Sequence, residues 1–179
     1  MKKKWLTVIL LFISMVSLSQ ITQEEAKLYE LIMEYRIEKG LPRIPLSPSL
    51  MFVAQTHVRD LVDNTPDLGD CNGHSWSDKG DWTPCCYTPD HAQAQCMWDK
   101  PRELTSYTGN GYEIAIGSND IISGYVATAD SALKGWKGSP LHNAVILNEG
   151  IWNIVEWKAI GIGIYKGFVC AWFGSEPDE

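Results

Sequence analysis

The sequence lacks the motifs of the common enzyme classes. It contains no G-x-S-x-G nucleophile turn, no H-E-x-x-H metal-binding helix, no glycine-rich phosphate loop and no dinucleotide fingerprint. It also lacks internal repeats, and 15 Gly and 9 Pro in 179 residues exclude a collagen-like or low-complexity chain. The composition therefore indicates one ordinary globular domain.

Positive charge is scarce. Lys and Arg number 15 against 22 Asp and Glu, which gives a formal net charge of −7. Three of the lysines stand at residues 2–4, so a chain without its first twenty residues has 12 basic and 22 acidic residues and a net charge of −10. This excess of negative charge argues against nucleic acid or an anionic membrane as the main partner.

Long apolar runs are limited to one, near the amino terminus. It extends from Trp5 to Leu18 behind the three lysines, and it is shorter than the ~20 residues that a spanning helix needs. Small residues stand at its end, at Ser17 and Ser19, so we predict a secretory signal at residues 1–20, cleaved after Ser19 or Gln20. The alternative is a single membrane anchor. We expect a secreted protein, extracellular or periplasmic, with no membrane span after cleavage.

Cysteine is concentrated in one segment. Four of the five cysteines, Cys71, Cys85, Cys86 and Cys96, fall within 26 positions. In an oxidising compartment this pattern predicts disulfides that brace a long loop, although the pairing is left open. Cys170 lies in an apolar stretch and is predicted to be unpaired and buried. A monomer is expected, while the odd cysteine leaves a disulfide-linked dimer as an alternative.

Histidines among the cysteines allow a second interpretation of the same segment. His74 and His91 lie there, so a metal cluster is conceivable, as is a nucleophile formed by Cys71 and His74. No C-x2-C pair is present, and thiols are seldom kept reduced outside the cell, so disulfides are favoured. We expect His91 on the surface. A serine paired with a histidine, at Ser75 or Ser139, is left open.

Hydrophobic periodicity predicts helices early in the chain and strands late. We expect helices over 23–39, over about fifteen residues from Pro48, over 121–136, and from 140 toward 147. Strands are expected at 111–117, 158–165 and 168–174, the last two forming a hairpin. Residues 65–111 show no periodicity. The pattern indicates an α+β fold with helices on a mostly antiparallel sheet. His57, on the apolar stripe of the second helix, is expected to be a hydrogen-bonded structural histidine.

Five segments in order carry a family resemblance. They are LYELIMEYRIEKGLPRIPLSPSLMFVAQTHVRDL, CNGHSW, GYEIA, WKGSPLHNAVIL, and EWKAIGIGIY with FVCAWFG. Together they resemble the CAP superfamily, or SCP domain, of cysteine-rich secretory, antigen 5 and pathogenesis-related class 1 proteins, in a bacterial form. The resemblance implies a three-layer α-β-α sandwich over residues 21–175. Residues 176–179 are then expected to be an acidic, solvated tail.

The resemblance also implies a cleft lined by two histidines and two glutamates, which binds zinc or another divalent ion in some members. By motif, the histidines are His74 and His142. Tyr112 stands at the first glutamate position and Glu113 one residue later, while the second glutamate, after Trp136, is missing. The candidate metal ligands are therefore His74, His142 and Glu113, with Glu113 also the candidate catalytic base. A local bulge would be needed to bring Glu113 to the cleft.

Two classes of function follow from this reduced site. The first is a secreted binding module that presents the histidine-lined cleft to an extracellular lipid, glycan or protein. The second is a metal-assisted, protease-like hydrolase in which Glu113 moves a proton from bound water. Because one glutamate is absent and the other displaced, the binding module is favoured. Trp76, Trp82 and Trp98 are expected to pack the irregular segment rather than to form a carbohydrate platform.

Overall fold

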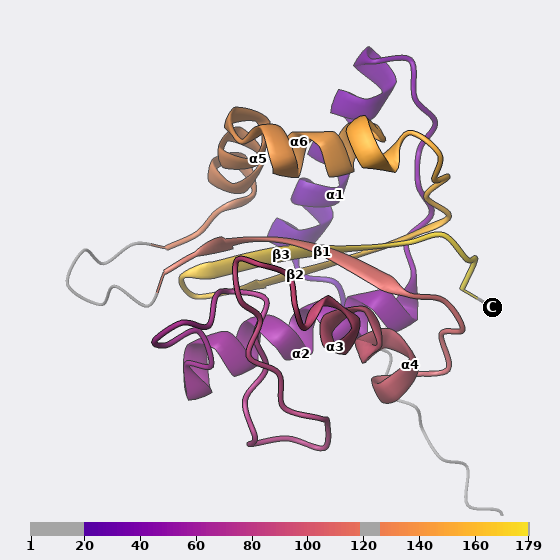
Figure 1. Ribbon diagram of the computed structural model, residues 1–179. Coiled ribbons are helices and arrows are strands. Elements are labelled where there is room, and N and C mark those ends of the chain that lie inside the picture. Colours follow the sequence, from indigo (N-terminus) through magenta and orange to yellow (C-terminus); the bar gives the residue numbers. More distant parts are fainter. Residues whose placement is uncertain (1–19, 119–125, 179) are drawn as a thin grey trace, which may run out of the picture.

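The chain folds into the three layers that the sequence predicts. The computed structural model describes residues 20–118 and 126–178, so the predicted signal segment, apart from Gln20, lies outside the described residues. Figure 1 shows helices on both faces of one sheet. One face is covered by α1 (Gln23–Glu38), α5 (Ala129–Gly138) and α6 (Pro140–Leu147). The other is covered by α2 (Pro48–Asn64), α3 (Ala94–Trp98) and α4 (Lys100–Leu104).

The helices begin where local capping groups stand. Thr22 and Glu25 form a capping box at the start of α1, and Ser47 accepts a hydrogen bond from the backbone N–H of Leu50 at the start of α2. The predicted helix over 121–136 begins later, at Ala129, because Thr128 caps it. Residues 126–128 are therefore not helical, and residues 121–125 of that prediction lie outside the described residues.

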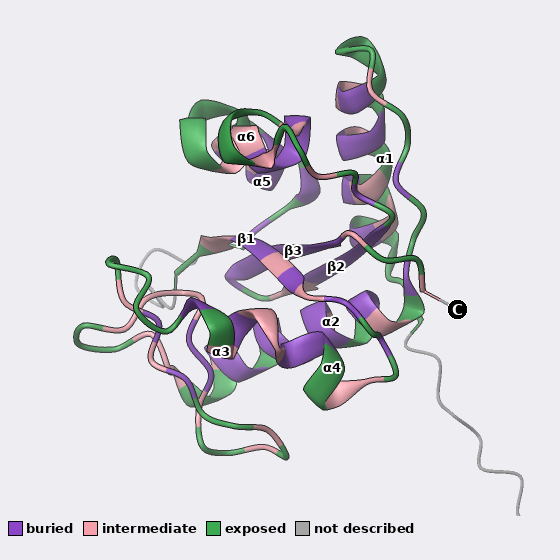
Figure 2. Cartoon of the chain, turned by 45° about the vertical axis from the view of Figure 1, so that its right-hand side comes forward, coloured by how far each residue is buried: buried purple, intermediate pink, exposed green. Residues whose placement is uncertain are grey.

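The sheet is antiparallel and has the order β1-β3-β2. Its strands are β1 (Gly111–Gly117), β2 (Ala159–Tyr165) and β3 (Phe168–Gly174), and a short 3-10 helix, η1 (Gly150–Trp152), precedes β2. Figure 2 shows that both helical layers turn buried surfaces toward the sheet. Gly161 and Gly163 of β2 lie directly against the backbone of α2, where an added Cβ would clash with Leu50 and Ala54. The G-x-G pattern thus permits close packing of α2 on the sheet.

Two disulfides brace the irregular segment, as predicted. Cys71 bonds to Cys86 and Cys85 to Cys96, while Cys170 is free and buried. A cysteine metal cluster and a Cys71 nucleophile are therefore wrong. Trp76 is 2% exposed, in the core between α2 and the sheet, and Trp82 and Trp98 pack against that core.

The acidic tail is exposed at Glu176 and Pro177, as predicted, but it is anchored to the domain, which was not predicted. The Asp178 carboxylate accepts hydrogen bonds from the Ser47 hydroxyl (2.5 Å) and the Ser49 backbone N–H (2.8 Å). The Tyr107 hydroxyl donates to the Glu176 carbonyl at 2.6 Å and accepts from its N–H at 3.1 Å. The tail thereby closes the start of α2, where unpaired N–H groups favour a carboxylate.

Replacing Asp178 by alanine is expected to lower the free energy of unfolding by about 1 kcal/mol, the usual cost of a lost helix cap. Urea denaturation of the two proteins measures this difference. Glu176→Ala is the matched control, since Glu176 bonds to Tyr107 through its backbone. An equal loss in both variants would show that the cap is not responsible.

Candidate functional site

Glu113 lies at the centre of a buried chain of polar groups. The β1–β3 register runs without interruption from Gly111↔Gly174 to Gly117↔Phe168, so the bulge considered above is absent from this strand. The Glu113 side chain is nevertheless placed against His74, and it is 0% exposed. Its Oε1 lies 2.5 Å from His57 Nδ1 and its Oε2 lies 2.7 Å from His74 Nδ1. Both carboxylate oxygens are therefore engaged.

His57 is a buried cation. Its Nδ1 faces the Glu113 carboxylate and its Nε2 lies 2.9 Å from the Ser75 carbonyl oxygen. Since both partners only accept hydrogen bonds, both ring nitrogens donate and the ring is an imidazolium. Burial lowers the pKa of His57, but the charge of Glu113 and its hydrogen bond outweigh burial and raise it. The ring also stacks on Trp76, with centroids 4.4 Å apart.

The environment keeps Glu113 ionised. Burial raises the pKa of the Glu113 carboxyl. The charge and hydrogen bond of His57, followed by those of His74, outweigh burial and lower this pKa to about 2. A carboxylate with so low a pKa is a weak proton acceptor near neutral pH. Glu113 is therefore suited to holding two histidines in place and poorly suited to general base catalysis.

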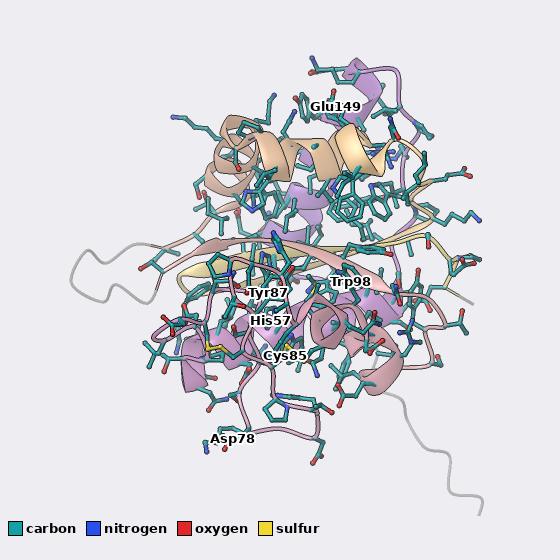
Figure 3. All side chains as sticks on the ribbon, in the orientation of Figure 1. His57, Asp78, Cys85, Tyr87, Trp98 and Glu149 are labelled. Carbon is teal, nitrogen blue, oxygen red and sulfur yellow. A yellow bond between two sulfur atoms is a disulfide. The ribbon has the colours of Figure 1, made fainter. Side chains whose placement is uncertain are left out.

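His74 is held by Glu113 with one nitrogen available. Its side chain is 22% exposed, and its Nδ1–H donates to the carboxylate. Among the described residues, no hydrogen bond engages Nε2. A carboxylate that fixes one nitrogen of a histidine and leaves the other open is the usual support of a metal-binding histidine. Tyr87 contacts the His74 ring edge-on, with centroids 5.2 Å apart, and Figure 3 shows Tyr87 and His57 on the α2 side of the sheet.

His142 approaches this site from the opposite layer, on α6. Burial lowers the pKa of His142, the nearby charge of His74 lowers it further, and Glu113 acts in the opposite sense. The imidazole is therefore neutral at about pH 7, which is the form that binds metal ions. In the part of the chain that the structure describes, His142 makes no hydrogen bond to Glu113 or His74, so the three predicted ligands do not form one bonded cluster.

A different trio is the most compact one among the described residues. Ligand atoms of His57, Glu113 and Cys170 lie within 4.8 Å of one another. These residues do not suit a metal, because His57 already donates from both nitrogens. In addition, burial and then Glu113 raise the pKa of the Cys170 thiol well above its usual value, and the thiol donates to the Ala54 carbonyl. The donors that fit a zinc ion are the neutral imidazole of His142 and the Nε2 of His74, with Glu113 behind His74.

Sequence reasoning missed the role of α2 in holding the His74 segment. His57 and Asp60 are one turn apart on α2, so they share a face. His57 donates to Ser75, and the buried Asp60 accepts hydrogen bonds from the N–H (2.7 Å) and hydroxyl of Ser77. His57 is a hydrogen-bonded structural histidine, as predicted; the spacing of His57 and Asp60 was the signal that both bind the His74 segment.

Three other residues named in the sequence analysis contribute no functional side chain to this site. Tyr112, at the first glutamate position of the family, contacts Trp98 and Trp152, with centroids 5.6 and 5.0 Å apart. His91 is exposed, as predicted. Ser75 is 0% exposed, and its hydroxyl accepts from the Tyr87 N–H at 2.9 Å, so it is not a free nucleophile.

Comparison with known proteins identifies related folds. A family profile described as the cysteine-rich secretory protein family, CAP, matches residues 29–167. An outer surface protein from Borrelia burgdorferi is similar at a TM-score of 0.56 and 16% identity, over 88% of this chain and 96% of that one. An extracellular SCP-domain protein from Bacillus anthracis str. Ames is similar at 0.57 and 17% identity, over 88% and 45%.

A third solved structure gives the same result. A cysteine-rich secretory protein from Staphylococcus aureus is similar at a TM-score of 0.51 and 17% identity, over 86% of this chain and 38% of that one. The present chain thus spans less than half of these last two proteins. A search of curated proteins yields no significant match.

The disulfides and the similar structures bear on the compartment in which the protein is found. Two disulfides are typical of an oxidising compartment, and the similar structures are described as outer-surface or extracellular proteins. Among the described residues, no helix has both the length and the hydropathy to cross a membrane. The profile match covers most of the chain and agrees with the observed three-layer fold: the chain belongs to the cysteine-rich secretory protein (CAP) family.

Proposed function

We propose that the protein is a secreted binding module whose ligand site includes His74 and His142. The observation that carries this proposal is the state of Glu113. Its side chain is 0% exposed, and each of its oxygens is bonded to a histidine. The site therefore presents oriented imidazoles rather than a free acid–base pair, which favours recognition over bond cleavage.

A divalent ion such as zinc is the candidate cofactor of this site. His74 and His142 would hold it, because among the described residues each imidazole has a ring nitrogen that makes no hydrogen bond to the protein. When bound, the ion would supply positive charge to a ligand oxygen. Glu113 would support it indirectly, by fixing the His74 ring.

The metal-assisted hydrolase is the weaker alternative. It needs a group that accepts a proton from water, and Glu113 was the candidate. The low pKa of Glu113, about 2, and its lack of exposure make it a poor base. With no second carboxylate at the position after Trp136, the proposal excludes a catalytic role for this site.

Zinc titration of the oxidised protein lacking residues 1–19 tests the site. We expect binding in the micromolar range by calorimetry, and a loss of at least about tenfold in affinity in the His74→Ala, His142→Ala double variant. His91→Ala is the matched control, since His91 is exposed and pairs only with Tyr87 among the described residues. Binding that the double variant retains would remove the metal from the proposal.

Incubation with quenched-fluorescent casein, with and without zinc, tests the hydrolase. We expect no cleavage above that of the double variant. Turnover by the wild type that is lost in His74→Ala would overturn the binding-only proposal.

A further inference from the structure

The two edges of the sheet differ in how their backbone groups are satisfied. On the outer edge of β2, three N–H groups point away from β3 and each finds a partner. Ile160 donates to the Pro45 carbonyl (3.0 Å) and Ile162 to the Met51 sulfur (3.1 Å). Ile164 donates to the Glu25 carboxylate (3.2 Å). This edge is closed by α1, α2 and the segment that joins them.

The register shows which groups of β1 face outward. Successive residues of β3 point their backbone groups alternately toward β2 and toward β1. Ile160, Ile162 and Ile164 of β2 point away from β3, so the β3 residues opposite them point toward β1. Those β3 residues pair with Tyr112, Ile114 and Ile116 of β1. The bond from Ser118 N–H to the Gly167 carbonyl continues the same alternation. The N–H and C=O groups of Glu113 and Ala115 therefore point away from the sheet.

In the part of the chain that the structure describes, no partner closes this second edge. Within residues 20–118 and 126–178, no strand other than β3 pairs with β1, and no hydrogen bond engages the outward groups of Glu113 and Ala115. Glu113 as a residue is 7% exposed while its side chain is 0% exposed, so the exposed area belongs to its main chain. Ala115 is half-buried. Solvent thus reaches part of the Glu113 main chain.

The edge carries one of the features that usually prevent pairing with another chain, the inward-pointing charge of Glu113, and lacks three others. Proline, lysine, inward-pointing charged residues, a bulge, or cover by a helix or loop are the common protections. The sequence of β1, GYEIAIG, contains neither proline nor lysine, and its register has no bulge. An edge strand with outward N–H and C=O groups that lack partners among the described residues is a template for one more strand.

We propose that the outer edge of β1 binds an extended peptide, which adds a fourth strand through the backbone groups of Glu113 and Ala115. The proposal rests on the binding role proposed above and names its ligand class. It fits the surroundings of the edge. Tyr112 and Trp152 offer half-buried aromatic surface on one face of β1 for an apolar peptide side chain, and Trp98 of α3 contacts Tyr112 from the other helical layer. On the other face, Glu113 holds His74, which offers a polar contact.

Amide hydrogen exchange of the free protein provides the first test. The N–H groups of Glu113 and Ala115 are expected to exchange much faster than those of Tyr112, Ile114 and Ile116, which face β3. Slow exchange at Glu113 and Ala115 at all protein concentrations would mean that the edge is already covered. Protection that grows with protein concentration would mean that a second copy, not a peptide, occupies it. Either result overturns the proposal.

Peptide selection provides the second test. A displayed library of random peptides of about seven residues is selected on the oxidised protein, and the affinity of the best synthetic peptide is measured by fluorescence anisotropy. We expect Ala115→Pro, which replaces the outward N–H by a ring, to weaken binding by about tenfold or more. Ala115→Ser keeps the N–H and is expected to bind normally.

Backbone methylation of the peptide makes the test independent of whether Ala115→Pro folds. N-methyl groups at alternate peptide positions should abolish binding in one frame and spare it in the other, because only alternate N–H groups face β1. A binder that tolerates both frames, or a library that yields none, would overturn the peptide proposal. Zinc binding by His74 and His142 would be unaffected by that result, so the two proposals fail separately.

Discussion

Replacing Glu113 by leucine is expected to lower the free energy of unfolding by about 3–5 kcal/mol, the largest effect of any single substitution considered for this protein. The variant leaves the His57 imidazolium, which is 0% exposed, without its counter-ion. His57 must then lose its proton or remain as an uncompensated buried charge, and either costs stability. Urea denaturation followed by circular dichroism measures the loss.

The double variant His57→Leu, Glu113→Leu separates the charge from the packing. Removing both members of a buried ion pair is often close to neutral, so we expect most of the lost stability to return. If the double variant is as unstable as Glu113→Leu, the cost comes from the volume and shape of the new side chain and not from the unpaired charge.

The pH dependence of stability reports on the same pair. The raised pKa of His57 adds stability below its unfolded value near 6.5, and this is lost as the pH rises through the folded value. The lowered pKa of Glu113 adds stability above its unfolded value near 4.5, and this is lost as the pH falls toward about 2. The pair therefore contributes fully between these two unfolded values, and the double variant should lack that contribution.

Replacing Cys71 and Cys86 together by serine is expected to lower the free energy of unfolding by about 3 kcal/mol, from the 15-residue separation that the bond closes. His74 lies between these two cysteines, so the loss also loosens the segment that places it beside Glu113. We expect weaker zinc binding as well as lower stability.

Cys170→Ala is the control for the disulfide variant, because Cys170 is free and outside the disulfide-braced segment. Zinc affinity should be close to that of the wild type in this control, although some stability is lost through the small cavity. Unchanged stability in the Cys71→Ser, Cys86→Ser variant would show that α2 alone holds the segment through Ser75 and Ser77.

Local signals predicted most of the elements. The strand at Gly111–Gly117 has the predicted bounds, and the helices that follow Ser47 and Ser139 start with the prolines that were recognised. The helix predicted from residue 121 was wrong at its start, because the cap at Thr128 was not recognised. The anchoring of the tail through Asp178 was missed, since residues at a chain end are usually not tied down.

The sequence by itself determined the family, the order of helices and strands, the segment that the disulfides brace and the histidines to inspect. These depend on periodicity, caps and spacing, which act between residues close in the chain. Only the tertiary structure decided the environment of Glu113, whose partners His57 and His74 are 56 and 39 positions away. It also decided the contact of Asp178 with Ser47, 131 positions away. Charge, pKa and edge exposure depend on such distant neighbours, because an ionised or unpaired group is stabilised by whatever folding brings against it.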